Sequence, residues 1–183
     1  MIGAAILRVA KPEDAGAIAA IYAPFVTDTV ISFEIHPPEA DEMRRRISSS
    51  LITYPWLVAE NSGQVVGYAY ASQHRAREAY RWACDIAVYL SPPVQGHGLG
   101  SALYTELLRI LTSQGFRRAY GGIALPNAAS VALHEKMGFR HLGTYTKVGF
   151  KLGQWHDVGW WQCPLGSSES APEDIIPFAV WTG

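Results

Sequence analysis

The chain has 183 residues, 49% of them hydrophobic and 17% charged, and its formal net charge at pH 7 is −1. This length allows one domain with a substantial core, and the composition is typical of a compact soluble protein. The nearly neutral charge excludes the basic footprint of a nucleic-acid-binding protein, and no apolar run approaches the roughly 20 residues that cross a membrane.

The first third of the chain is predicted to form a short strand and two helices. Residues 6–9 read as the strand, and Pro12 opens the first helix, whose apolar side chains fall on one face. A loop over residues 27–38 leads to the second helix at 39–51. The arginine run at 44–46 in that helix is predicted to be a solvated surface rather than a site.

Two strands, at residues 56–60 and 65–71, are expected to pair through a hairpin turn at 61–64. The polar segment that follows carries Arg75 and Arg77, whose side chains project to the same side if the chain is extended. Two guanidinium groups side by side suit a small molecule with two anionic groups, because each can form bidentate hydrogen bonds. An exposed basic loop is the alternative.

A central strand is predicted at residues 82–90, where apolar side chains occupy both faces. Asp85 is the only charged residue in it. A carboxylate in such a strand is costly unless it has a partner or a chemical task. Asp85 is therefore a candidate catalytic residue, and Pro92 and Pro93 end the strand after it.

Three glycines, Gly96, Gly98 and Gly100, stand where a helical leucine pattern begins, and the pattern stops at Gly115. The free N–H groups and the positive dipole end of a helix N-terminus favour a phosphate, and glycines let it approach. A tight turn without a ligand is the alternative. The segment lacks the Gly-Lys-Ser/Thr of a P-loop, and the next strand, 118–125, lacks the terminal acidic residue of a dinucleotide site.

The C-terminal third is expected to hold paired strands at residues 143–162. His156 and Asp157 are adjacent, but neighbours in a strand face opposite ways, so structural roles are predicted for both. A polar tail follows at 167–183. Its apolar end, 178–181, is expected to dock on the body of the protein or on a partner subunit.

Two signatures resemble those of the GNAT N-acetyltransferase superfamily. The segment Gln95-Gly96-His97-Gly98-Leu99-Gly100 resembles the pyrophosphate loop Q/R-x-x-G-x-G/A, with a strand before it and a helix after it. Residues 127–139 resemble the second signature, N-x-x-S-x-x-L-Y/H-E-K-x-G-F. Because the two signatures stand in the right order and at the right separation, the match is a specific one.

Further segments resemble one GNAT branch, the phosphinothricin N-acetyltransferases. These segments are 31–34, 73–82 and 151–158. The resemblance spans residues 6–165 and implies one domain at 1–166, followed by the tail at 167–183. The implied fold class is α/β: a mixed, mostly antiparallel sheet flanked by helices, in which the strand of Asp85 and the next strand splay apart.

The resemblance also implies that acetyl-CoA is the co-substrate. Its pantetheine arm would enter the splay and pair with the strand backbone, its pyrophosphate would rest on the glycine loop, and Asn127 would hold the arm. The strand residues of this predicted cofactor site are Val88, Tyr89 and Leu90. The loop residues are Gln95, Gly96, His97, Gly98, Leu99, Gly100 and Ser101.

The implied chemistry is direct transfer of an acetyl group from the thioester to a primary amine. The amine arrives protonated, so a carboxylate with a raised pKa removes its proton, directly or through water. Asp85 stands where this branch usually has glutamate, and its shorter side chain favours transfer through water. The structural alternative is that Asp85 acts as a cap or pairs with an arginine such as Arg77.

His134 stands where many GNAT enzymes have the tyrosine that protonates the departing thiolate, and where this branch has histidine. An imidazole can act as an acid toward the thiolate or as a base toward the amine. We predict a role for His134 in the site, with a purely structural histidine as the alternative.

Arg75 and Arg77 favour an anionic, amino-acid-sized acceptor over cationic amines such as polyamines or aminoglycosides. By resemblance, the acceptor would be glutamate-like and acetylated on its α-amino group: phosphinothricin, methionine sulfoximine or sulfone, or arsinothricin. Phe33, Glu34 and Tyr80 would line its pocket. Two other functions stay open, a non-catalytic acyl-CoA sensor on the same fold and a GNAT enzyme that acts on another amine or on a protein.

The remaining predictions concern the surroundings of the protein. Cys84 and Cys163 form no framework of pairs and the N-terminus lacks a signal-peptide pattern, so the reducing cytoplasm is the expected location. The histidines have no metal-ligand spacing, so no metal is predicted. Neither a nucleic-acid nor a membrane partner is expected, and the resemblance implies a homodimer with the site near its interface.

Overall fold

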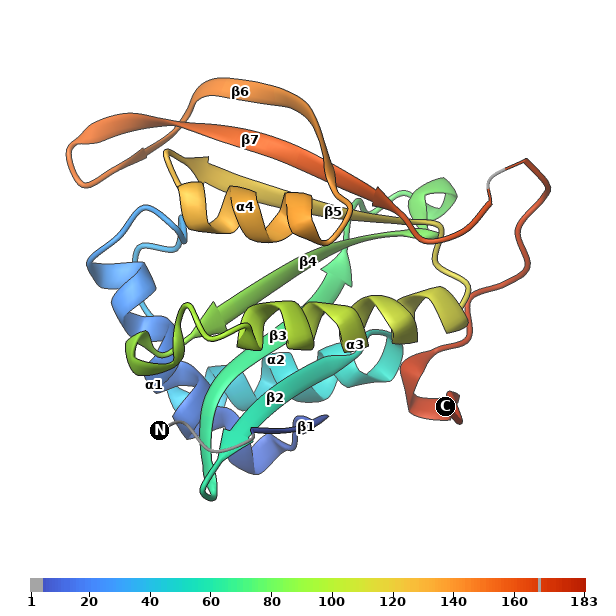
Figure 1. The fold of residues 1–183 in the computed structure, drawn as a ribbon, viewed down its shortest axis with the longest axis horizontal. Coiled ribbons are helices and arrows are strands. Elements are labelled where there is room, and N and C mark those ends of the chain that lie inside the picture. Colours follow the sequence, from blue (N-terminus) through green and yellow to red (C-terminus); the bar gives the residue numbers. More distant parts are fainter. Residues whose placement is uncertain (1–4, 168) are drawn as a thin grey trace.

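A computed structural model describes residues 5–167 and 169–183, and shows helices on both faces of one seven-stranded sheet (Figure 1). The strand order is β1-β2-β3-β4-β5-β7-β6, in which β4 and β5 are parallel and the other neighbours are antiparallel. The strands are β1 (Ile6–Val9), β2 (Trp56–Asn61), β3 (Gln64–Gln73), β4 (Ala83–Leu90), β5 (Arg118–Leu125), β6 (Arg140–Lys151) and β7 (Gln154–Pro164). The helices are α1 (Ala15–Thr27), α2 (Ala40–Thr53), α3 (Leu99–Ser113) and α4 (Ala128–Lys136). The predicted fold class is confirmed.

The hairpin between β2 and β3 forms where the sequence predicts it. Asn61 pairs with Gln64, and the two residues between them, Ser62 and Gly63, have positive φ angles of 51° and 79°. A two-residue turn of this kind matches the right-handed twist of the strands, and its left-handed backbone favours glycine. The polar segment 61–64 thus sets the register of both strands.

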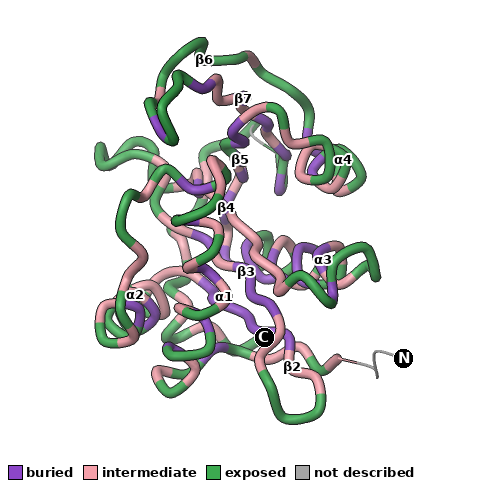
Figure 2. Tube along the Cα trace, turned by 90° about the vertical axis from the view of Figure 1, so that its left-hand side faces the viewer, coloured by how far each residue is buried: buried purple, intermediate pink, exposed green. Residues whose placement is uncertain are grey.

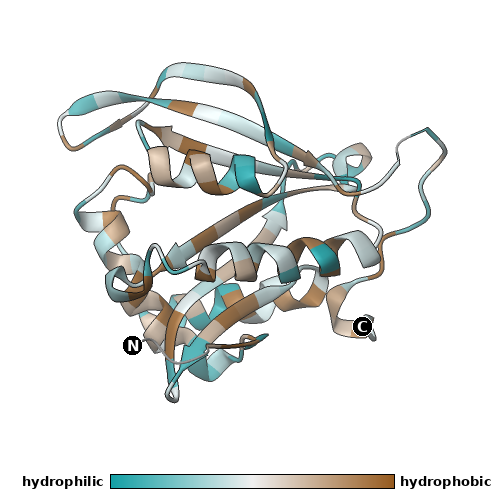
Figure 3. Cartoon of the chain, viewed as in Figure 1, coloured by the Kyte–Doolittle hydropathy of each residue, from teal (hydrophilic) through white to brown (hydrophobic). Residues whose placement is uncertain are grey.

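Two hydrophobic layers cover the sheet, with α3 and α4 on one face and α1 and α2 on the other (Figure 2). In α3, Leu103, Leu107 and Leu111 recur every four residues and are fully buried. They pack in one cluster with Cys84 and Ile86 of β4. The β4 strand is coloured largely as hydrophobic in Figure 3. Burial of each such leucine contributes roughly 1.5–3 kcal/mol, so α3 is fixed firmly against the central strand.

The sheet splits between β4 and β5. The two strands pair only where Ala83–Asp85 meets Arg118–Tyr120, whereas β4 stays paired with β3 as far as Leu90 and β5 stays paired with β7 as far as Leu125. The strands then diverge, as Figure 1 shows. The splay that the family resemblance implied is therefore present, and it leaves one backbone edge of β4 without a strand partner.

The C-terminal tail packs on the body of the chain, beside the end of α3. The side-chain amide of Gln114 donates to the carbonyl oxygens of Thr53 (2.9 Å) and Ile176 (2.8 Å), and Trp181 Nε1 donates to Ser113 Oγ (2.9 Å). Of the two docking surfaces predicted for the tail, the structure shows the body. The domain boundary at 166/167 stays a prediction, and residues 1–4 and 168 of the predicted domain and tail lie outside the described residues.

Candidate active site

A groove of about 430 Å³ lies where the end of β4, the glycine turn and α4 meet. Most of the predicted cofactor residues line it: Val88, Tyr89, Leu90, Gln95, Gly96, Gly98, Gly100, Ser101 and Asn127. Two others do not, because His97 is exposed and Leu99 packs against the core. Asn127 also caps α4, where its side-chain oxygen accepts from the backbone N–H of Ser130 at 3.1 Å.

The glycine turn has the geometry that an anion site at a helix N-terminus needs. Gly96 and Gly98 have φ angles of 78° and 81°, and Gly98 is the residue that caps α3. A Cβ added at either glycine would meet no atom within 4 Å, so the space above the backbone is open. The first turn of α3 also carries no acidic side chain. These residues therefore fit the pyrophosphate of a nucleotide such as acetyl-CoA.

A smaller cavity of about 50 Å³ lies in the splay and adjoins the groove. Ala87 and Val88 of β4 and Gly122 and Ile123 of β5 line it, and Val88 is shared with the groove. The unpaired edge of β4 faces this space, so its N–H and C=O groups are available to an extended ligand. The splay thus offers the pantetheine arm a strand edge with which to pair.

His134 lies on the inner face of α4, at the splay, and is buried. Its Nδ1 lies 2.8 Å from the carbonyl oxygen of Ser130, which only accepts, so Nδ1 carries the proton and Nε2 accepts from the Tyr104 hydroxyl at 3.2 Å. Burial lowers the pKa of His134. The imidazole is therefore held neutral, with both ring nitrogens engaged.

Asp85 lies at the paired end of β4 and has a partner that the sequence did not reveal. Its Oδ1 is 2.6 Å from Nδ1 of His74, which follows directly after β3. Burial raises the pKa of Asp85, and the hydrogen bond from His74 opposes that rise only in part. The predicted structural alternative placed an arginine such as Arg77 beside Asp85. The structure corrects this detail, because the partner is a histidine.

The His74 ring is held in one orientation by aromatic neighbours. It stacks on Tyr120 with 4.3 Å between ring centroids and an interplanar angle of 15°. The ring of Trp160 meets it edge-on at 6.1 Å, and that of Tyr80 at 6.3 Å. Tyr80, predicted from resemblance to line the substrate pocket, therefore lies beside His74.

A third hollow, a cavity of about 300 Å³, lies on the same face of the sheet as Asp85; we call it the acceptor cavity. Its lining residues are His74, Arg75, Tyr120, Leu142, Gly143, Thr144, Tyr145 and Trp160. The guanidinium of Arg75 lies 5.9 Å from the centroid of the Trp160 ring, and the buried Nε1 of Trp160 has no hydrogen-bond partner among the described residues. The wall therefore presents one cation, Arg75, beside an aromatic ring whose N–H is enclosed in the protein.

Arg77 stands apart from this cavity. It precedes the short 3₁₀ helix Glu78–Tyr80, is exposed, and lines no cavity described for residues 5–167 and 169–183. The structure thus brings Arg75 to the acceptor cavity but does not bring the two predicted arginines together there. The segment is not an extended strand here, because the chain turns into the 3₁₀ helix directly after Arg77.

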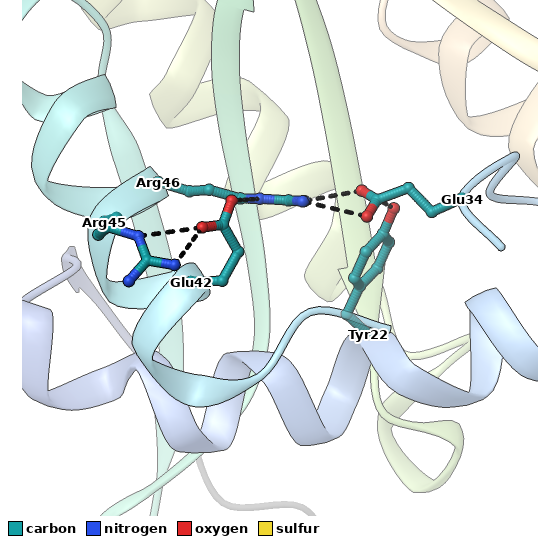
Figure 4. Close-up of polar contacts among 5 residues, drawn as sticks. All are labelled: Tyr22, Glu34, Glu42, Arg45 and Arg46. Carbon is teal, nitrogen blue, oxygen red and sulfur yellow. Dashed lines mark hydrogen bonds and ion pairs between the residues drawn. The ribbon is translucent and has the colours of Figure 1, made fainter. Parts of the chain in front are cut away.

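Glu34 is tied into a network with α1 and α2 (Figure 4). Its carboxylate accepts from Arg46 Nη1 at 2.7 Å, from Arg46 Nη2 at 3.1 Å and from the Tyr22 hydroxyl at 2.9 Å. Burial acts to raise the pKa of Glu34, but these hydrogen bonds hold it below its usual range. The prediction of a solvated arginine run holds only in part for Arg46, whose side chain is 37% exposed but whose fork pairs with Glu34. Arg44 and Arg45 are exposed, as predicted.

Lys151 fixes the other side of the loop that carries Phe33 and Glu34. Its buried ammonium donates to the carbonyl oxygens of Val26 and Ser32, at 2.6 Å each, and burial lowers its pKa. Phe33 itself packs over Gly149, where any Cβ would clash with its ring. Sequence reasoning missed Lys151 because its partners are backbone atoms more than a hundred positions away.

His156 and Asp157 have the structural roles predicted for them. His156 is buried and its Nε2 donates to the carbonyl oxygen of Lys151 at 2.9 Å, while Asp157 Oδ1 accepts from the backbone N–H of Lys147 at 2.7 Å. Within residues 5–167 and 169–183 there is no group of three or more histidine, cysteine or acidic side chains that could hold a metal ion. No described helix is long and apolar enough to span a bilayer.

Comparison with known proteins assigns this groove and splay to a family. Residues 7–160 match the family model described as an acetyltransferase (GNAT) domain. The chain belongs to the GNAT acetyltransferase family. This GNAT protein is 41% identical to the phosphinothricin N-acetyltransferase of Streptomyces viridochromogenes over 156 residues, which are 85% of each chain. It is also 32% identical to the L-methionine sulfoximine/L-methionine sulfone acetyltransferase of Salmonella typhimurium, over 91% of this chain and 98% of that one.

A solved relative carries the co-substrate. The crystal structure of a GNAT superfamily phosphinothricin acetyltransferase from Sinorhizobium meliloti, in complex with AcCoA, has a TM-score of 0.90 and 38% identity, covering 98% of this chain and 99% of that one. The GNAT protein described here is thus an N-acetyltransferase that uses acetyl-CoA. The predicted family, enzyme class and co-substrate are confirmed.

Proposed function

We propose that this enzyme acetylates the α-amino group of a small anionic amino acid of the glutamate-like kind. The observation that carries the proposal is the acceptor cavity, which places Arg75 one residue from the His74–Asp85 pair. A carboxylate bound by the guanidinium of Arg75 would leave the amine of the same molecule close to that pair. The names of the relatives, which act on phosphinothricin and methionine sulfoximine, support this class of acceptor.

The co-substrate and the acceptor bind in different places in this proposal, the first in the groove and the splay and the second in the acceptor cavity. We propose that the groove and the splay hold acetyl-CoA, with Gly96, Gly98 and Ser101 at its pyrophosphate and Val88 at its arm. The acceptor loses a proton to the Asp85 region, and its free electron pair then attacks the thioester carbon. The unpaired N–H groups of β4 stabilise the negative charge that develops on the carbonyl oxygen. No covalent enzyme intermediate is required.

We propose that His134 acts at the thiolate end of the transfer, together with Tyr104. Both line the cavity in the splay, and their mutual hydrogen bond positions a hydroxyl and an imidazole at the arm of the co-substrate. Burial raises the pKa of the Tyr104 hydroxyl, which keeps it protonated as a donor at neutral pH. In Tyr104→Phe, kcat is expected to fall while the Kd of acetyl-CoA stays unchanged; an unchanged kcat would remove the pair from the mechanism.

We further propose that the enzyme is a cytoplasmic homodimer whose interface includes the β6–β7 hairpin. Large apolar side chains are exposed along this hairpin: Leu142, Tyr145, Val148, Phe150, Leu152 and Trp155. A monomer that leaves such a strip in water is prone to association, and a second copy of the chain would bury it. Sedimentation at two protein concentrations tests the dimer, and a monomer at both would contradict it.

The substrate proposal is tested by acetyl-CoA-dependent thiol release with two groups of amines. The anionic group contains phosphinothricin, methionine sulfoximine, methionine sulfone and arsinothricin, and the cationic group contains spermidine and an aminoglycoside. Saturable turnover of the anionic group alone is expected. Turnover of only the cationic group would overturn the acceptor class while leaving the enzyme class intact.

A further inference from the structure

We propose that His74 is the residue that takes the proton from the acceptor amine, through its Nε2 atom, with Asp85 behind it as the positioning carboxylate. This inference rests on the proposed function, because it concerns the acceptor cavity. It changes the role of Asp85, which the sequence presents as the base itself.

The two ring nitrogens of His74 have different surroundings. Nδ1 lies 2.6 Å from Asp85 Oδ1, so in the neutral ring it carries the proton and donates it to the carboxylate. Nε2 has no hydrogen-bond partner among the described residues, and the ring lines the acceptor cavity next to Arg75. The side chain of Asp85 is the more exposed of the two, at 30% against 12%, but it does not line the acceptor cavity, whereas His74 does. The imidazole thus presents one free basic atom to the acceptor cavity, and its other nitrogen is bound to the carboxylate.

The surroundings of His74 suit an atom that must gain and lose a proton without moving. The stack on Tyr120 fixes the plane of the ring, and Trp160 and Tyr80 meet it edge-on. The charged groups beside the ring are Asp85 and Arg75. The phenols of Tyr120 and Tyr145 line the same cavity, and Tyr80 contacts the ring from outside that lining. An imidazole bridges the distance that the short aspartate side chain leaves open.

The proton balance of the step is complete without another reactant. The acceptor R–NH₃⁺ gives one proton to the Nε2 lone pair, which leaves R–NH₂ and an imidazolium paired with the Asp85 carboxylate. The amine lone pair forms the C–N bond, the C–S bond breaks, and the second amine proton ends on the thiolate sulfur. The imidazolium then returns its proton to water, and the next cycle starts from neutral His74.

The decisive variant is His74→Asn, because an asparagine keeps a donor toward Asp85 but has no atom that can take a proton. If His74 is the base, kcat/KM at pH 7 is expected to fall about 10²–10⁴-fold, with the Kd of acetyl-CoA unchanged. The acid limb of the pH profile of kcat/KM should disappear as well. If Asp85 accepts the proton directly, His74→Asn retains activity within about threefold of wild type and the proposal is overturned.

Two controls guard against trivial loss of activity. His36→Asn changes an exposed histidine that lines no described cavity, and it is expected to keep wild-type kinetics. For folding, the thermal melt and acetyl-CoA binding of His74→Asn are compared with wild type. In His74→Ala, added imidazole should restore part of the rate, and the rate should saturate with the imidazole concentration. A base at this position would be contradicted if imidazole restored nothing in His74→Ala and if His74→Asn kept its rate.

The comparison of the His74 and Asp85 variants does not depend on which amine is the natural acceptor. The variants are assayed with whichever amine of the two groups the wild type uses best, so a wrong substrate class leaves the comparison of His74 and Asp85 valid. Nitrogen-15 NMR of the histidine rings, in the absence of any acceptor, gives an independent reading. A proton on Nδ1 of His74 that shifts upfield in Asp85→Asn supports the pair, and an unperturbed signal contradicts it.

Discussion

The two ends of β4 differ in a way that suits the two binding roles proposed for this strand. At its first end, Asp85 lies where β4 is paired with both β3 and β5, and the side chains on that face meet in an aromatic-walled cavity. At its second end, Val88–Leu90 lies where β5 has diverged, and the backbone itself is open. Where β4 has a strand on both sides, its side chains are held in fixed positions. Where β5 has diverged, the N–H and C=O groups of β4 are left free to bind a ligand.

Each end also has its own histidine, and their hydrogen bonds differ. His134, at the splayed end, donates to a backbone carbonyl and accepts from Tyr104, so it has no free nitrogen. His74, at the paired end, uses one nitrogen on Asp85 and directs the other toward the acceptor cavity. Residue type alone does not separate the two. Their partners do, and those partners come from other elements of the fold.

The largest expected effect comes from removing the carboxylate at the paired end. In Asp85→Asn, kcat/KM should fall about 10²–10⁴-fold because the proton acceptor loses its charge or its positioning partner. The Kd of acetyl-CoA, measured by calorimetry, should not change, because the groove lies at the other end of β4. A parallel loss of acetyl-CoA binding would mean that the two ends are not independent.

A large effect on stability is expected from Gly121→Ala, in β5 at the start of the splay. A Cβ there would lie 2.5 Å from Nε2 of His134, so the imidazole and α4 must shift, at a cost of about 1–3 kcal/mol in the free energy of unfolding. Gly143→Ala in β6 is the matched control, since its Cβ would meet nothing within 4 Å. Urea unfolding measures the free energy of unfolding of both variants. Equal values would show that the packing of His134 against Gly121 does not hold α4 in place.

A moderate effect is expected from Arg75→Ala. The KM for an anionic acceptor should rise about tenfold, equivalent to about 1.4 kcal/mol of lost binding, with little change in kcat. Arg77→Ala, outside the acceptor cavity, should raise KM less. Steady-state kinetics at fixed acetyl-CoA compares the two, and an equal or larger rise for Arg77→Ala would restore the two-arginine clamp that the sequence predicts.

The smallest expected effect concerns how stability varies with pH. Burial raises the folded-state pKa of Asp85, so its unfavourable contribution is absent below the unfolded pKa, develops as the pH rises from the unfolded to the folded pKa, and is constant above that. Asp85→Asn lacks this titration. Relative to wild type, its free energy of unfolding should therefore rise slightly as the pH is raised above 4. Denaturant titrations at several pH values test this, and a relative decrease would reverse the assignment.

The sequence was sufficient for features whose cause is local. The 61–64 turn, the glycines before α3 and the burial stripe of α3 follow from backbone preference and from period, and the structure has them where expected. The splay of β4 and β5 was expected only through family resemblance, because strand divergence leaves no periodic signal in either strand.

Contacts between distant elements could not be predicted. The His74–Asp85 hydrogen bond depends on the β3–β4 register, in which Gln73 lies opposite Cys84, and a shift of one residue would place the two side chains on opposite faces. The fork of Arg46 on Glu34 depends on how α2 packs beside the 27–38 loop, and in sequence Arg46 looks the same as Arg44 and Arg45. Such pairings follow from tertiary packing, which leaves no local pattern in the sequence.

The side-chain amide of Gln114 links parts of the chain that are far apart in the sequence. One buried side chain joins the end of α2 at Thr53, the end of α3 and the tail at Ile176, three segments that are separated by about sixty positions each. Removal of the tail would take away one of the two acceptors of the Gln114 amide and would expose the C-terminal end of α3 to water. The last residues therefore fasten the C-terminal end of α3, opposite the glycine turn at its N-terminus, and a fusion or cleavage near the C-terminus would act first on how α3 packs against α2.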